Sequence, residues 1–190
     1  MMIFTILLIT AYVAGSVNFS ILVFRLLGKE DPRKHFSGNP GATNVFRQAG
    51  AGWALFVLLL DMGRAVCVAL MALCLLKADY APWIGLSLIL GNRFPCFHNF
   101  RGGKGVANYL GFTAIIAPVA AGLSVLGWGI LFAMLRLPFI SSFLMVLILS
   151  GGTLLAYDGR PIPTAGAIAT ATLIFYNHKS NLMNLKASSK

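Results

Sequence analysis

Apolar runs separated by short polar segments occupy almost the whole chain. A run of about 20 apolar residues is long enough to cross a bilayer as an α-helix. Lipid cannot satisfy backbone N–H and C=O groups, so segments that cross it in this way are helical. The pattern therefore predicts an all-α integral membrane protein, a compact bundle of seven transmembrane helices in a single domain over residues 1–190. The predicted spans are 2–27, 52–76, 81–94, 106–117, 121–135, 140–156 and 162–176.

The region around Pro118 allows two interpretations, because the runs on either side of it are shorter than a full span. It can hold two short helices or one long kinked helix. With two helices, nearly all loop bases gather on the side of the first loop, which the positive-inside rule places in the cytoplasm. With one helix, the basic tail that contains Lys186 and Lys190 would lie outside. We therefore expect the N-terminus outside, the C-terminus in the cytoplasm, and only Lys77 and Arg160 facing outward.

Composition supports this class and excludes others. Of the 190 residues 58% are hydrophobic and 11% charged, whereas soluble domains carry about 25% charged residues. The formal charge of +10 does not indicate nucleic acid, because the bases lie in short loops and form no continuous stripe. Cys67, Cys74 and Cys96 form no CxxC pair, so we expect small core residues and no disulfide framework. The first apolar run is too long for a cleaved signal peptide and lacks a basic start, so it is treated as a span.

A glycine-rich polar motif, SGNPGATNVFR at residues 37–47, follows the first span. Its glycines and proline permit tight turns that direct several N–H groups inward, and such a nest suits a phosphate. Arg47 can clamp phosphate oxygens with two parallel hydrogen bonds. An ordinary polar turn is the alternative. The candidate residues of this motif are Ser37, Gly38, Asn39, Gly41, Thr43, Asn44 and Arg47.

A second motif, NFRGGKGVAN at residues 99–108, leads glycines directly into an apolar helix. Free N–H groups at a helix start favour an anion, and Lys104 adds a mobile positive charge beside Gly103. The motif is not a Walker A loop, since it lacks the early glycine and the Ser or Thr that follows the lysine. The alternative is a simple bend at the membrane surface, which Gly-Gly also permits.

A third cluster, YNHKSNL at residues 176–182, closes the last span. His178 and Asn181 would share one helical face, because they are spaced i, i+3. A lone terminal histidine is more often a capping or snorkelling group than a catalyst, so both interpretations remain open. Ser142, next to Ser141, opens the sixth span, where an N-cap is the simpler interpretation.

Few charged residues lie inside the predicted spans. Asp61 and Arg64 are spaced i, i+3 in the second span and can pair on a face that lines the bundle interior. Pairing is favoured because a charged side chain at mid-bilayer costs about 2.5–3.5 kcal/mol. The first span carries the polar residues Ser16, Asn18 and Ser20, which we expect along one helix that also holds Gly15. There they serve interhelical hydrogen bonding and close packing.

With these segments assembled, the chain resembles the bacterial acyl-phosphate:glycerol-3-phosphate acyltransferases, the PlsY family, over nearly its whole length. The chain departs from the family pattern at Asn92, where the family usually has histidine, and at Arg64 and Ala65, where Lys-Gly is common. Lys179 and Asn184 also stand where arginine is common. The resemblance is carried by Gly15-Ser16-Val17-Asn18, by residues 37–47 and 100–107, and by Ser142, His178 and Asn181.

The resemblance implies transfer of a fatty acyl group from acyl phosphate to the 1-hydroxyl of glycerol 3-phosphate, which gives lysophosphatidic acid and phosphate and begins phospholipid synthesis. It implies one transmembrane acyltransferase domain in the cell inner membrane, with the active site facing the cytoplasm. The expected partners are acyl phosphate, glycerol 3-phosphate and membrane lipid, and no cofactor, metal or nucleic acid is expected. The His-x4-Asp pair of the soluble-type acyltransferases is absent from the chain.

Carried over residue by residue, the resemblance gives catalytic roles to His178, Lys104, Arg47 and Ser37. The first motif with Ser37 would hold acyl phosphate, and Lys104, Arg47, His178 and Asn181 would hold glycerol 3-phosphate. Both substrates carry phosphate and the mixed anhydride has a good leaving group, so positioning and oxyanion stabilisation suffice without a covalent serine. The proton acceptor remains open between His178 and a donor phosphate oxygen. The expected substrate-binding set is Gly38, Asn39, Gly41, Thr43, Asn44, Gly103, Ser142 and Asn181.

Two other classes compete with this interpretation: a transporter or channel for a phosphorylated solute, and a purely structural membrane protein. A transporter needs a pathway through the membrane, yet Asp61 and Arg64 are almost the only charges within the spans and all the motifs lie on one side. A structural protein leaves the density of motifs unexplained. The pattern therefore favours chemistry at the cytoplasmic surface.

Overall fold

The computed structural model describes residues 1–188, with side chains described through residue 183, and within them every regular element is helical. The side chains of Asn184 and Lys186 and all of Lys190, which entered the sequence predictions, lie outside the described part. Two 3-10 turns, η1 (Pro32–Lys34) and η2 (Ala78–Tyr80), accompany the α-helices. The α-helices are α1 (Met2–Ser16), α2 (Phe19–Leu26), α3 (Ala42–Ala49), α4 (Ala51–Leu75), α5 (Ala81–Arg93), α6 (Val106–Ile116), α7 (Pro118–Leu135), α8 (Pro138–Ala156), α9 (Pro161–Asn177) and α10 (Lys179–Ser188).

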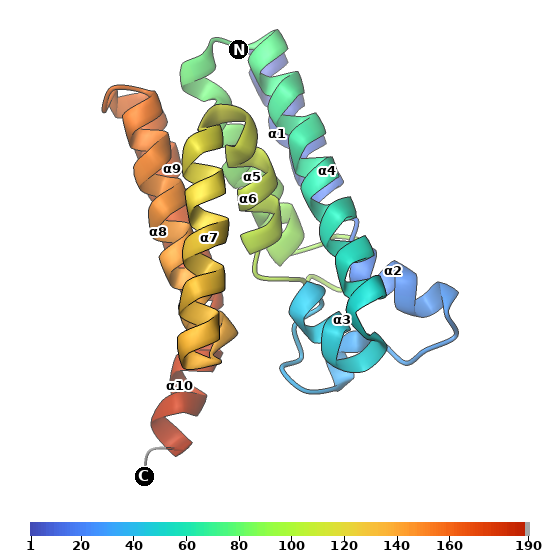
Figure 1. Cartoon of the computed structure of the whole chain (residues 1–190). Helices are drawn as coiled ribbons and strands as arrows, with labels where there is room; N and C mark the ends of the chain where they lie inside the picture. The colour runs from blue at the N-terminus through green and yellow to red at the C-terminus, as the bar shows by residue number, and fades with distance from the viewer. Residues whose placement is uncertain (189–190) are drawn as a thin grey trace.

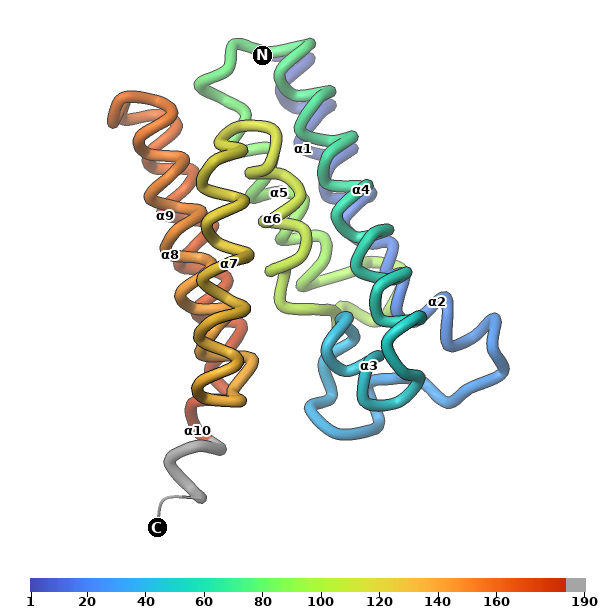
Figure 2. Tube along the Cα trace, in the orientation of Figure 1, coloured from blue at the N-terminus to red at the C-terminus, as the bar shows by residue number. Residues whose placement is uncertain are grey.

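The long helices run side by side, and the start of α1 and α10 lie at opposite ends of the bundle (Figure 1). The main packing pairs are α1 with α5, α7 with α8, α4 with α6, α3 with α4, and α5 with α9. Figure 2 shows α2, α3 and the start of α4 gathered at the end of the bundle from which α10 also leaves. This end, which we call the motif end, therefore carries the polar motif at 37–47.

Four of the described segments are long and apolar enough to cross a membrane: Met2–Leu26, α4, α7 and α8. The shorter helices α5 and α6 bury much of their surface among the other helices. Because protein surrounds their ends, they need not be as long as the hydrocarbon core is thick. Large apolar side chains are exposed on the outer helices, as expected for surfaces in contact with lipid. The predicted apolar runs are helical apart from a short break in the first, and the predicted all-α class is confirmed.

The first predicted span is interrupted, which corrects the expectation of one helix through Ser16, Asn18 and Ser20. Helix α1 ends at Ser16, and the extended backbone at Val17 and Asn18 separates it from α2. The side chain of Asn18 accepts a hydrogen bond from the Ile21 N–H at 3.1 Å and so caps α2. Short polar side chains compete with helical hydrogen bonds in this way, and apolar patterning does not show it.

The expected close packing around Gly15 is confirmed. A Cβ atom at Gly15 would lie 2.1 Å from the Leu88 carbonyl oxygen, and one at Gly91 would lie 2.0 Å from the Tyr12 carbonyl oxygen. Only glycine permits backbones to approach so closely, which is typical of helix pairs in membranes. Helices α1 and α5 are therefore in backbone contact near the motif end.

Pro118 separates two helices and does not kink one. Helix α6 ends at Ile116, and Pro118 is the first residue of α7. Proline suits this first position because its missing N–H would have no partner there. The structure therefore agrees with the first of the two interpretations that the sequence allowed, two separate helices.

The cysteine expectation was half wrong. Cys67, Cys74 and Cys96 are free thiols, as expected, but all three are exposed and none is a core residue. Lipid-facing and core positions are both apolar, so a small residue within an apolar run does not show which of them it occupies.

Candidate active site

The motif at 37–47 folds back onto α3. The Asn44 amide donates to the carbonyl oxygens of Pro32 (2.8 Å) and His35 (3.3 Å), and Gln48 donates to Pro32 at 3.1 Å. Gly38 has φ +64, a left-handed conformation that glycine adopts without strain. Asn44 is therefore engaged in holding the loop, although the sequence suggested it as a ligand.

Helix α3 begins after Gly41 without a side-chain cap. Its first N–H groups lack intrahelical acceptors, and together with the helix dipole they form an anion-binding end. Asn39 and Thr43 flank this start, and the Asn39 carbonyl accepts the Gly41 N–H at 2.9 Å. We call this helix start with the turn that precedes it the first cradle.

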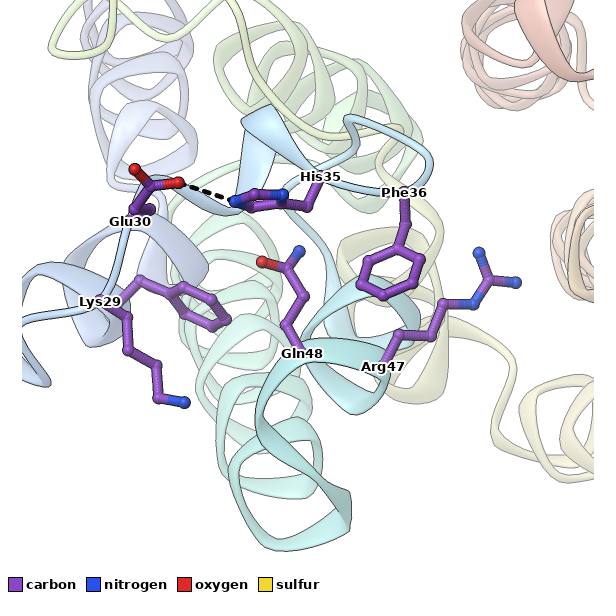
Figure 3. A pocket seen from close by; sticks show the side chains of 7 residues that line it. Lys29, Glu30, His35, Phe36, Arg47 and Gln48 are labelled. Atoms are coloured by element: carbon purple, nitrogen blue, oxygen red, sulfur yellow. Dashed lines mark hydrogen bonds and ion pairs between the residues drawn. The ribbon is translucent and has the colours of Figure 1, made fainter.

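Arg47 and Ser37 are exposed at the same end of the molecule. Arg47 lines a shallow hollow of about 390 Å³ together with Phe36, His35 and Gln48. Figure 3 shows its guanidinium pointing away from Glu30 and His35, whose side chains pair at 2.8 Å. Arg47 forms none of the ion pairs found among the described side chains, so its charge is free to bind a phosphate.

The glycine loop of the second motif folds back onto the C-terminal end of α5. The N–H groups of Gly102 and Gly103 donate to the carbonyl oxygens of Arg93 (3.1 Å) and Asn92 (2.9 Å). Gly105 has φ +96 and precedes α6, which also lacks a side-chain cap. The start of α6 with Gly103 and Lys104 is thus a second anion-binding end, which we call the second cradle.

The two cradles lie against each other. A Cβ atom at Gly103 would lie 3.5 Å from the Pro40 carbonyl oxygen, so the glycine loop packs on the first motif. Arg33, in the turn just before the first motif, also contacts the loop before α6, because its Nη1 donates to the carbonyl oxygens of His98 (2.9 Å) and Arg101 (2.8 Å). The structure therefore unites motifs that are far apart in the chain.

The third cluster, at the junction of α9 and α10, contacts the second cradle. Lys104 Nζ donates to Asn181 Oδ1, and the Asn177 amide donates to the Lys104 carbonyl oxygen at 3.2 Å. His178 is buried, and its Nδ1 lies 2.8 Å from the Ile174 carbonyl oxygen. That contact assigns the proton to Nδ1 and leaves Nε2 as an acceptor. Asn177 carried no chemical signal in the sequence beyond its place next to His178.

Burial sets the charge state of this cluster. Burial, with a smaller contribution from the nearby Arg93 charge, lowers the pKa of Lys104 to about 8. Burial and the Lys104 charge lower the pKa of His178 to about 4. Near neutral pH, His178 is therefore a neutral imidazole beside a cationic but easily deprotonated lysine.

The pH dependence of anion binding is expected to follow Lys104. Its ammonium is present below the pKa of about 8 and is lost above it, so affinity for a phosphate should fall as the pH rises through that value. The measurement is the dissociation constant of a phosphate-bearing ligand from pH 6 to 10 beside that of Lys104→Arg, whose guanidinium stays charged. A wild-type profile that stays flat up to pH 10 would contradict the role of Lys104.

Ser142 is not brought into this group by any described contact. Its hydroxyl donates to the Pro138 carbonyl oxygen at 2.9 Å and accepts from the Trp128 indole N–H at 3.3 Å. The neighbouring Phe143 contacts His178 instead, with ring centroids 5.3 Å apart. A substrate contact by Ser142 stays a prediction.

The fold and the site together define an integral membrane protein with two adjoining anion-binding helix starts at one end of its bundle. A family model described as glycerol-3-phosphate acyltransferase matches residues 5–188, and the chain belongs to this family of lipid-synthesising enzymes. The predicted family is thereby confirmed, and the transporter and structural alternatives are set aside.

Individual members of the family match nearly the whole length of the chain. A glycerol-3-phosphate acyltransferase of Pseudomonas fluorescens is 39% identical over 97% of this chain and 96% of its own length. One from Methylobacillus flagellatus is 35% identical over 95% of this chain and 92% of its own length. A crystal structure of PlsY, an integral membrane glycerol 3-phosphate acyltransferase, in its glycerol 3-phosphate form has a TM-score of 0.88 at 32% identity and covers 97% of this chain and 92% of its own. The lysophosphatidic acid form has a TM-score of 0.86 at 31% identity and the same coverage.

Proposed function

We propose that the chain transfers a fatty acyl group from acyl phosphate to the 1-hydroxyl of glycerol 3-phosphate, giving lysophosphatidic acid and phosphate. The observation that carries the proposal is the contact between the two cradles at Pro40 and Gly103. A reaction between two phosphate-bearing substrates needs two adjacent anion sites, and this arrangement supplies them. The glycerol 3-phosphate and lysophosphatidic acid forms of PlsY fit the acceptor and the product.

The first cradle is assigned to the donor. The N–H groups at the start of α3, the turn with Gly38, and the exposed Ser37 face the donor phosphate. Glycerol 3-phosphate is assigned to the second cradle, where Lys104 and Asn181 are already in contact. Arg47 reaches the phosphates from the hollow of Figure 3. Gly41, Asn39 and Thr43 shape the donor side, and Asn44 acts by holding its loop.

In the transfer, the 1-hydroxyl oxygen attacks the acyl carbonyl carbon and forms the ester bond. The bond between that carbon and the bridging oxygen breaks, and phosphate leaves with the electron pair. The hydroxyl proton passes to a phosphate oxygen of the donor, because a base whose pKa is about 4 gives little driving force at neutral pH. His178 then positions the acceptor through Nε2.

Replacing His178 with Gln tests this division of labour. We expect kcat to fall by less than about tenfold, since loss of a general base costs about 100- to 10,000-fold. The measurement is kcat at saturating substrates, with binding of glycerol 3-phosphate measured separately. A fall of a thousandfold with intact binding would restore histidine as the base.

We further propose that one domain over residues 1–190 crosses the inner membrane seven times, with the N-terminus outside and the motif end in the cytoplasm. The opposite positions of the start of α1 and of α10 in Figure 1 support the odd number of crossings. Exposed bases such as Arg25, Lys29 and Arg101 lie in the segments of the motif end, as the positive-inside rule requires.

Thiol labelling tests this orientation. In a background without the natural cysteines, Ser37→Cys at the motif end and Asp158→Cys in the α8–α9 turn are both exposed positions. In sealed inside-out vesicles, an impermeant reagent should label position 37 and not position 158. The reverse pattern would contradict the proposed topology.

The donor is tested with purified protein, radiolabelled glycerol 3-phosphate and either a long-chain acyl phosphate or an acyl-CoA. We expect lysophosphatidate from acyl phosphate and none from acyl-CoA. Product from acyl-CoA alone would keep the family activity and overturn the proposed donor.

A further inference from the structure

Arg64 lies where three segments behind the two cradles meet. Its Nη1 donates to the carbonyl oxygens of Ala14, at 3.1 Å, and Val17. Its Nη2 donates to Asp61 Oδ1 and to Asn108 Oδ1, both at 2.7 Å. The predicted pair with Asp61 is thereby confirmed, but it accounts for only one of these contacts.

The break between α1 and α2 depends on such donors. A helix that ends inside an apolar segment leaves its last carbonyl oxygens without helical partners, and lipid offers none. Arg64 supplies N–H groups to Ala14 and Val17, one on each side of the end of α1 at Ser16. The Ala14 oxygen also accepts the Val17 N–H at 3.2 Å, whereas for the Val17 oxygen Arg64 replaces the helical donor, because the Ile21 N–H is bound to the Asn18 side chain. The guanidinium therefore holds the break at this depth.

The break in turn holds the first cradle. Asn18 lies in it, caps α2 through Oδ1, and directs its Nδ2 to the Pro40 carbonyl oxygen at 3.5 Å. The same oxygen packs against Gly103 of the second cradle. A shift of the break would therefore move the junction between the two cradles.

The contact with Asn108 holds the second cradle. Asn108 is buried in the first turn of α6, the turn whose free N–H groups form the anion-binding end. The guanidinium of Arg64, which extends from α4, thus fixes both the start of α6 and the break between α1 and α2. An ammonium reproduces this geometry only in part, because its donors radiate from a single nitrogen atom.

We propose that Arg64 is a positioning residue for catalysis, which acts through Asn18 and Asn108 and sets the spacing of the two cradles. It touches neither substrate. The proposal rests on the assignment of glycerol 3-phosphate to the second cradle. Its effect should therefore appear first in the affinity for that substrate.

The test uses the double variant Asp61→Asn/Arg64→Gln, which removes both charges and leaves none unpaired in the membrane. The dissociation constant of radiolabelled glycerol 3-phosphate is measured by equilibrium dialysis on the monodisperse protein. Small displacements of binding groups cost up to about a hundredfold, so we expect at least about a tenfold rise in the dissociation constant. Arg64→Lys should recover part of the affinity, since it keeps the cation beside Asp61.

The matched control is Asp79→Asn/Arg160→Gln. Arg160 also pairs with an aspartate and donates to a carbonyl oxygen, that of Tyr157 at 3.1 Å, but its turn lies at the end of the bundle opposite α3 (Figure 1). Its dissociation constant should equal that of the wild type. An equal loss in both double variants would show a merely structural role and overturn the proposal.

Asn108→Ala gives a second route if the Arg64 double variant does not fold. It removes one contact of the guanidinium and should also weaken binding, and an unchanged dissociation constant would overturn the proposal. The binding assay needs no acyl donor. A wild type that binds glycerol 3-phosphate but rejects acyl phosphate would therefore contradict the proposed function and leave the role of Arg64 standing.

Discussion

Lys104→Met should lower kcat/KM for glycerol 3-phosphate by about 100- to 1,000-fold, the usual cost of removing one preorganised electrostatic donor from an active site. Lys104 lies at the start of α6 with its ammonium on Asn181, so its charge adds to that of the helix start. The half-buried position strengthens its field at a phosphate because little water screens it. Steady-state kinetics with purified protein measure the effect.

Lys179→Met is the matched control for that experiment. Lys179 belongs to the same C-terminal segment as Asn181, the partner of Lys104. It is exposed, and its Nζ donates to the Tyr176 hydroxyl at 3.0 Å. We expect its kcat/KM to stay within about twofold of the wild type, because exposed surface charges contribute little. If both variants lost activity equally, a general effect of basic charge would replace the specific role of Lys104.

Gly103→Ala should have the second largest effect. The added Cβ would lie 2.9 Å from Asn92 Nδ2 and 3.5 Å from the Pro40 carbonyl oxygen, in the contact between the cradles. The contact with Pro40 is ordinary, but at 2.9 Å the methyl group must displace the Asn92 amide or the loop that carries Gly103 and Lys104. A displacement of such a binding loop near 1 Å can cost about a hundredfold in rate. The measurement is kcat/KM together with thermal unfolding in detergent.

Gly129→Ala is its control, since no atom within 4 Å would meet the new methyl group in α7. This variant should keep full activity, and an alanine in a helix interior stabilises relative to glycine. Wild-type kinetics for Gly103→Ala would show that the position of the glycine loop does not matter for activity and would contradict the role assigned to the second cradle.

Apolar runs were sufficient to predict most helices of this protein, because crossing lipid imposes length and hydrogen bonding on the chain. They could not predict the break at Val17 and Asn18, because the N–H groups that stabilise it belong to Arg64 in another helix. Pro118 shows the same limit. A kink and a new helix both satisfy the local sequence, and only the packing of α6 on α7 distinguishes them.

Residue types in the motifs indicated anion binding, but their partners depend on tertiary structure. The contact between Lys104 and Asn181 joins the α5–α6 loop to α10 and needs the packing of α5 on α9. Asn44 was expected to be a ligand from its type alone, yet its amide is used by the loop carbonyls of Pro32 and His35. Sequence shows which groups can bind a phosphate, whereas the fold decides which of them remain free.

The central claim is that the motif end transfers an acyl group directly between two bound phosphate substrates. It is tested most directly by incubating purified protein with acyl phosphate and radiolabelled inorganic phosphate, with and without glycerol 3-phosphate. A covalent acyl-enzyme would form without the acceptor and exchange label into acyl phosphate. Direct transfer predicts lysophosphatidate when glycerol 3-phosphate is present and no labelled acyl phosphate when it is absent. Exchange without the acceptor, or no lysophosphatidate with it, would contradict the claim.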